Sequence, residues 1–286
     1  MTTTWLRPAR IPAAETFALL AASLLTALLL ANPQPVPTTL FGTDAPSDPK
    51  QSLGSLPLSF LPNAGQADPQ VSFYLQGAAG SVWFTPTGLT MALPGSDGAA
   101  PWVAKLDFAG ARPVEPVGTG ATGATVGYFT GPQESWRTGI PAYSGITYPD
   151  LWPGIDLEYS GDAGKLKYQF VVHPGADPSQ IGLSWRGVDS LAVTASGALA
   201  ATTPNGGFTD DKPYSYQPVG GRQVEVASSY ALGTGSGGSH PYGFSVGTYD
   251  PALPLVIDPA IEFAGYIGGI GFEHGLGVDV DSSGAA

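Results

Sequence analysis

The chain has 286 residues, of which 40 are Gly and 28 are Pro, about a quarter of the total. Because both residues interrupt long helices, this composition excludes a helical bundle or a coiled coil. A net charge of −12 argues against a basic face that would bind nucleic acid or anionic lipid. The sequence contains no cysteine, so the chain forms no disulfide and offers no thiolate to a metal ion.

The first 31 residues have the pattern of an export signal. Arg7 and Arg10 precede the uncharged apolar run 17–31. A positive start before an apolar stretch of this length is typical of a secretory signal peptide, whereas a spanning helix usually needs about 20 apolar residues. Residues 1–31 are therefore predicted to be a signal peptide, with an N-terminal anchor as the alternative. Either would give a secreted or cell-surface protein that touches the membrane only through this segment.

Residues 32–52 contain five prolines and little apolar periodicity. Such dense proline spacing favours extended, solvated backbone, so this segment is predicted to be a linker.

Residues 53–258 have the pattern of an all-β domain. Short apolar-alternating runs are separated by turn residues at intervals of roughly 8–12 residues, as in sandwiches and barrels. We expect a β-sandwich-like domain, in one lobe or two packed lobes, with short helices at most. The candidate strands are 71–75, 81–85, 89–93, 103–108, 155–159, 165–172, 181–185 and 242–246.

The clearest local unit is a hairpin around residues 161–164, which include two glycines that tolerate positive φ. A four-residue loop would place Tyr159 opposite Leu166, so that apolar residues meet on one face. The same register would pair Glu158 with Lys167 on the outer face. We expect this register.

Acidic residues offer two places where catalysis could be sought. Asp156 and Glu158 share one strand face, about 6–7 Å apart, a separation that could support glycoside hydrolysis. The alternative is an outward face opposite Lys165 and Lys167, and we favour it because nothing nearby would raise the pKa of one carboxyl group. Residues 210–212 (Asp-Asp-Lys) are predicted to form a solvated turn. No catalytic residue is predicted.

Metal and cofactor motifs are weak. His173, His240 and His274 are not spaced as metal ligands. Residues 279–284 match the first half of a calcium loop without its last ligand, and we favour a β-turn there. Residues 118–123 have the glycine spacing of a dinucleotide-binding motif but no strand–helix context, so we expect a loop there. The sequence therefore predicts no metal and no cofactor.

Three aromatic residues are candidates for stacking on a ligand such as a sugar: Trp136, Tyr143 and Trp152. The alternative, which we favour in a β-rich domain, is that these rings belong to the core or hold a loop.

Six motifs follow one another in a recognisable order: LSFLPNAGQ (58–66), YFTG (128–131), WRTGIPAY (136–143), YPDLWPGIDL (148–157), YQFVVHPGADP (168–178) and PLVIDP (254–259). Together they resemble one bacterial family, the DUF7948-type domain found at the front of large secreted proteins with SBBP (seven-bladed β-propeller) repeats. The resemblance covers residues 53–258 and implies neither a catalytic group nor a cofactor.

The tail resembles the start of one SBBP repeat, in residues 263–275 and 278–284, so 259–286 is predicted to be an incomplete repeat. A propeller blade has four strands and buries its faces only against neighbouring blades. We therefore expect the tail to be loosely held or borrowed as an edge strand, and the reading frame to be truncated relative to its relatives.

These observations predict a non-catalytic exported surface or extracellular module that binds or scaffolds, with an extracellular glycan or protein as partner and no nucleic acid. Two alternatives remain open. One is a carbohydrate-binding or carbohydrate-active protein, and the other is a purely structural spacer.

Overall fold

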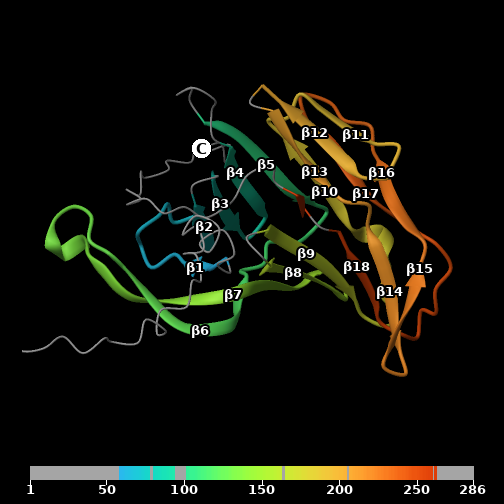
Figure 1. Cartoon of the computed structure of the whole chain (residues 1–286), viewed down its shortest axis with the longest axis horizontal. Coiled ribbons are helices and arrows are strands. Elements are labelled where there is room, and N and C mark those ends of the chain that lie inside the picture. The colour runs from blue at the N-terminus through green and yellow to red at the C-terminus, as the bar shows by residue number, and fades with distance from the viewer. Residues whose placement is uncertain are drawn as a thin grey trace, which may run out of the picture. The chain divides into compact units, whose positions relative to one another are not determined.

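The computed structural model describes residues 58–77, 80–93, 101–162, 165–204, 206–259 and 261–262. These residues form three antiparallel sheets (Figure 1). Their helical parts are two short 3-10 turns, η2 (Gln133–Ser135) and η3 (Pro178–Gln180), so the predicted all-β, sandwich-like fold is confirmed. In this part of the chain no helix has the length and apolar character to cross a bilayer. The predicted signal, linker and repeat start lie outside the described residues, apart from residues 259, 261 and 262.

Eight strands form the largest sheet. In spatial order they are β1 (Leu61–Pro62), β2 (Phe73–Gly77), β3 (Gly80–Thr85), β4 (Gly88–Leu93), β5 (Trp102–Ala109), β10 (Gly182–Arg186), β17 (His240–Val246) and β16 (Ser228–Leu232). The second sheet runs β15 (Arg222–Val226), β14 (Tyr214–Val219), β18 (Leu255–Asp258), β9 (Lys165–Val172), β8 (Ile155–Asp162), β7 (Arg137–Trp152) and β6 (Val117–Tyr128). The third contains β11 (Ser190–Val193), β12 (Leu199–Thr203), β13 (Gly206–Asp210) and β19 (Ile261–Glu262).

Aromatic side chains join the three sheets. Phe84 of β3 meets Tyr159 of β8 with ring centroids 5.0 Å apart, which connects the eight-stranded and seven-stranded sheets. Trp185 of β10 meets Phe208 of β13 at 4.7 Å, which adds the four-stranded sheet. Buried residues of all three sheets belong to one continuous cluster, so the described residues share one main core rather than two separate lobes.

The β8–β9 hairpin has a different register from the predicted one. Glu158 lies opposite Gln169, and the ladder continues to the pair Asp162 and Lys165. The predicted four-residue loop is therefore wrong, because only residues 163–164 separate the paired strands. The register shift is two residues, so every side chain keeps its predicted face.

Strands β6 and β7 form a long ribbon that belongs to two environments (Figure 1). The second half of β7 lies inside the seven-stranded sheet. The first half lies beside β1 to β3, where Ala142 packs with Trp83 and Tyr128 of β6 meets Tyr74 at 6.2 Å. Residues 118–123 are part of strand β6, so the loop predicted there is wrong.

Strand β19 pairs with β13 through Asp210 and Ile261. Residues 261 and 262 thus form an edge strand of the four-stranded sheet. The calcium-loop-like segment 279–284 lies outside the described residues.

Candidate functional site

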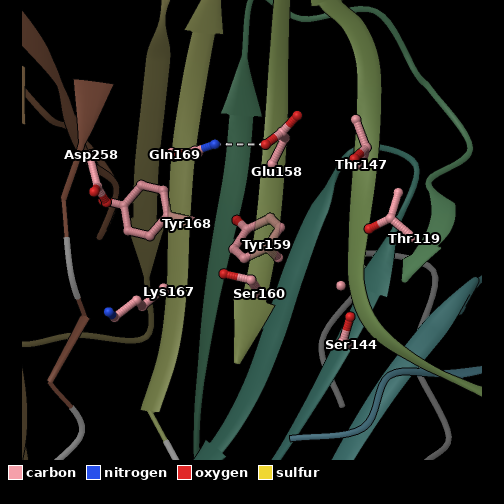
Figure 2. Close-up of a pocket in the computed structure, with 11 residues that line it drawn as sticks. Thr119, Ser144, Thr147, Glu158, Tyr159, Ser160, Lys167, Tyr168, Gln169 and Asp258 are labelled. Carbon is pink, nitrogen blue, oxygen red and sulfur yellow. Dashed lines mark hydrogen bonds between the residues drawn. The ribbon is translucent and has the colours of Figure 1, made fainter. Parts of the chain in front are cut away.

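A polar groove lies on the outer face of the seven-stranded sheet, and we call it the outer-face groove (Figure 2). Its volume is about 400 Å³. Strands β6, β7, β8, β9 and β18 contribute to it. The lining residues are Thr119, Ser144, Gly145, Thr147, Glu158, Tyr159, Ser160, Lys167, Tyr168, Gln169 and Asp258.

Strand alternation explains which side chains reach the groove. In β8, Leu157 and Tyr159 are buried in the core, whereas Glu158 and Ser160 point outward. The register places Glu158 beside Gln169 of β9, whose Nε2 donates to Glu158 Oε2 at 2.7 Å (Figure 2). Regular pairing therefore fixes the positions of the polar groups.

Gly145 keeps the β6 side of the groove open. A Cβ atom at this position would lie 2.7 Å from the carbonyl oxygen of Tyr159 and 2.9 Å from the hydroxyl oxygen of Thr119. Any larger residue would push the Thr119 side chain away from its place in the lining. The close approach of the two strands here requires glycine.

Charges of both signs line the groove. Glu158 and Asp258 supply carboxyl groups, and Lys167 supplies an ammonium group. Partial burial raises the pKa of Asp258, while the nearby Lys167 acts in the opposite direction. The groove therefore offers hydrogen-bond donors and acceptors, with two carboxyl groups to one ammonium.

Two tyrosines continue the same face beyond the groove. In β14, Ser215 and Gln217 are buried, so Tyr214 and Tyr216 point outward. Their ring centroids are 5.6 Å apart and their planes differ by 32°. Tyr214, whose side chain is 42% exposed, is the direct cross-strand partner of Asp258. We call Tyr214 and Tyr216 the tyrosine pair.

A buried acid lies on the other side of the groove floor. The Tyr168 hydroxyl donates a hydrogen bond to Asp210 Oδ2, while the second carboxyl oxygen, Oδ1, has no partner among the described residues. Burial raises the pKa of Asp210 to about 7, although the hydrogen bond from the Tyr168 hydroxyl acts in the opposite direction. Asp210 was predicted to lie in a solvated turn and is only 3% exposed, so that prediction is wrong.

The residues described above lie within a region of the chain that matches a known family. The family model described as "Domain of unknown function (DUF7948)" matches residues 60–260. The chain belongs to the DUF7948 family. The matched region includes the outer-face groove, the tyrosine pair and Asp210. No curated protein and no solved structure matches the chain.

One aromatic candidate from the sequence is a core residue of the DUF7948 domain. Trp152 is 1% exposed, and its indole N–H donates to the carbonyl oxygen of Ala109 at 3.1 Å. A ring in this position cannot stack on a ligand from solution, so the ligand-stacking prediction is corrected for Trp152.

The other two aromatic candidates, Tyr143 and Trp136, do not form one site with Trp152. Tyr143 is half-buried on β7, opposite Ala121 of β6, and its ring makes an edge contact with Phe73 at 6.0 Å. Trp136 is 41% exposed just before β7 and packs on Phe129 at 5.3 Å. Seven residue steps of extended strand, about 23 Å, separate Trp136 from Tyr143. The three residues do not form a platform, and a ligand role for Trp136 or Tyr143 stays a prediction.

The Tyr143 ring lies directly over Gly118, and this contact can be tested. A Cβ atom at position 118 would lie 2.7 Å from the ring. We expect Gly118→Ala to lower the free energy of unfolding by about 1–3 kcal/mol, because the ring must shift. Urea denaturation would measure it. In a Tyr143→Ala background the same substitution should cost much less, and an equal cost in both backgrounds would contradict the contact.

Asp156 and Glu158 do lie on the outer face, but their partners are not the predicted lysines. Asp156 Oδ1 accepts a hydrogen bond from the backbone N–H of Asp150 at 2.6 Å, and Oδ2 lies 2.9 Å from His173 Nε2. Asp156 therefore holds the turn before β8. Among the described residues, no three His, Cys, Asp or Glu side chains are grouped so that they could hold a metal ion.

Sequence reasoning missed Gln169, Asp258 and the tyrosine pair. The alternation Tyr-Ser-Tyr over 214–216 was a usable signal, because residues two apart in a strand share a face. No comparable signal marked Gln169 and Asp258, since their relation to the groove depends on the order of strands in the sheet.

Proposed function

We propose that the DUF7948 domain is a non-catalytic binding module of an exported surface or extracellular protein, and that the outer-face groove is its ligand site. The observation that carries the proposal is the groove itself. Polar side chains from five strands converge in one concavity, beside the outward-facing tyrosine pair. A small number of placed polar groups in a concave site is typical of small-ligand sites. A purely structural spacer requires no such site.

Export and membership of a propeller-repeat protein are part of the proposal. The apolar run after Arg7 and Arg10 supports export. The resemblance of residues 263–284 to the start of an SBBP repeat supports a place at the front of such a protein. Cell fractionation of the full chain, with the mass of its mature N-terminus, tests this part. Cytoplasmic protein beginning at Met1 would contradict it.

A second candidate is a carbohydrate-active enzyme that uses the two carboxyl groups of the groove. Glu158 and Asp258 lie on β8 and β18 with β9 between them, so two strand spacings, about 10 Å, separate their backbones. The raised pKa of Asp258 favours a general acid. This candidate requires hydrolysis of a glycan that is lost in both Glu158→Gln and Asp258→Asn. Hydrolysis unchanged in either variant would exclude it.

The binding function is tested by filling the groove. Ser160 is exposed in the groove, and Ser229 is an exposed serine on β16 in the eight-stranded sheet. We expect the purified full chain to sediment with bacterial cell envelopes, and Ser160→Trp to raise the apparent Kd of this retention at least about tenfold, which corresponds to about 1.4 kcal/mol. Ser229→Trp should leave retention unchanged. Equal retention of both variants, or no retention of the parent chain, would overturn the proposal.

A further inference from the structure

The groove lining consists of groups that suit a polyhydroxylated ligand. The side chains that point into it carry hydroxyl, amide, carboxyl and ammonium groups (Figure 2). Tyr159 and Tyr168 contribute only as the floor, because both are buried. A sugar hydroxyl both donates and accepts hydrogen bonds, so it needs donors and acceptors side by side. Gln169 and Glu158 offer that combination 2.7 Å apart.

The tyrosine pair adds an apolar surface at one end of these polar groups. The face of a sugar ring carries C–H groups that pack on an aromatic ring. Tyrosine suits this contact because it presents an apolar body with a polar tip. Since Tyr214 is the direct cross-strand partner of Asp258, a sugar on its ring would lie next to the groove.

The spacing of the strands sets the length of the ligand. From Thr147 on β7 to Tyr214 on β14, the face crosses β8, β9 and β18, which makes four strand spacings. At about 4.8 Å for each spacing, the surface is about 19 Å long. That is the span of an oligosaccharide rather than of a single sugar ring.

The charge of the groove and of the whole chain favours neutral over acidic sugars as ligands. Two carboxyl groups, Glu158 and Asp258, share the groove with one ammonium group, Lys167, and the whole chain has a net charge of −12. An anionic polysaccharide would meet repulsion both at long range and in the groove. From these four observations we propose that the outer-face groove and the tyrosine pair bind a neutral oligosaccharide that runs across the strands from β7 to β14. This inference rests on the proposed binding function.

Calorimetric titration of the purified full chain tests it. The probes are cellohexaose, mannohexaose and chitohexaose, with hexagalacturonate as the anionic comparison. We expect binding of at least one neutral hexamer and none of the anionic one. Tyr214→Ala and Gln169→Ala should each weaken binding about tenfold. The control is Phe129→Ala, since Phe129 is 63% exposed just after the end of β6 and does not line the groove, and this variant should bind like the parent chain.

Treatment of the envelopes separates failure of this inference from failure of the binding function. Periodate cleaves vicinal diols of sugars, whereas a protease removes proteins. We expect retention to survive protease and to be lost after periodate or, for a 4-linked N-acetylated glycan without vicinal diols, on addition of chitohexaose. If Ser160→Trp abolishes retention but neither periodate nor any of the three soluble neutral hexamers does, the groove binds something else and the carbohydrate inference is overturned alone. Neutral oligosaccharide binding that is unaffected by Tyr214→Ala would also overturn it.

Discussion

Replacement of Trp152 by alanine is expected to lower the free energy of unfolding by about 3–5 kcal/mol. The indole ring lies between Phe108 and Phe170, with centroid distances of 6.2 Å and 5.9 Å, and is 1% exposed. Its removal leaves a cavity in the core. The carbonyl oxygen of Ala109, which accepts the indole hydrogen bond in the parent chain, also loses its side-chain donor. Urea denaturation of the full chain, followed by circular dichroism, would measure the loss.

The matched control is Trp136→Ala. Trp136 is 41% exposed and contacts mainly Phe129, so its removal should cost less than about 1 kcal/mol. Equal costs at the two positions would contradict the assignment of Trp152 to the core. A large cost at Trp136 alone would indicate that the ribbon end is buried in solution.

The strands that could be predicted are those that bury one face. In β9, the buried residues Tyr168, Phe170 and Val172 alternate with residues of intermediate exposure, and this period of two is visible in the sequence. The faces of β8 and β9 were therefore predicted correctly. Their register was not, because a shift of two residues preserves every face and leaves the hydrophobic pattern unchanged.

The β6–β7 ribbon could not be predicted for the opposite reason. Most of β6 is exposed, so no buried face imposes an apolar alternation on the Gly- and Thr-rich segment 117–128. Its strand structure comes from pairing with β7, a tertiary interaction that local sequence does not encode. The position of the groove could not be predicted either, because it too depends on tertiary pairing. It depends on the placement of β18 beside β9, although the segment that contains β16 and β17 lies between β14 and β18 in the sequence.

Asp210 shows how a polar residue can be misplaced by sequence reasoning. The run Asp-Asp-Lys at 210–212 has the composition of a solvated turn, and Asp211 and Lys212 are indeed exposed. Asp210 is the last residue of β13, and it lies in register with buried Leu199. Strand alternation therefore directs its carboxyl group inward, toward Tyr168, against the preference of a carboxyl group for water.

Raising the pH from 4 to 8 is expected to remove about 4 kcal/mol of stability through Asp210 alone. The pKa of the folded state is about 7, against an ordinary value of 3.8. Between these values the folded protein holds a proton that the unfolded chain has released. The stabilisation is therefore fully present below about pH 4, declines as the pH rises through 7, and stays lost above it. The titratable neighbours of Asp210 include no cation that would stabilise its ionised form. They are Tyr168, Tyr230, Tyr242, Tyr159 and Asp211.

Comparison with Asp210→Asn separates the pH dependence of stability caused by Asp210 from that caused by the other acidic residues. Asparagine can accept the same hydrogen bond from the Tyr168 hydroxyl, but it does not titrate. Other groups, including Asp258 with its raised pKa, change both proteins equally and cancel in the difference. The difference in unfolding free energy between the parent chain and the variant, measured by urea denaturation at each pH, should fall by about 4 kcal/mol from pH 4 to pH 8. A difference that does not change with pH would mean that the carboxyl group of Asp210 is already ionised in the folded protein at pH 4. Tyr168 would then donate to a carboxylate, and the unpartnered oxygen Oδ1 would need a donor of its own.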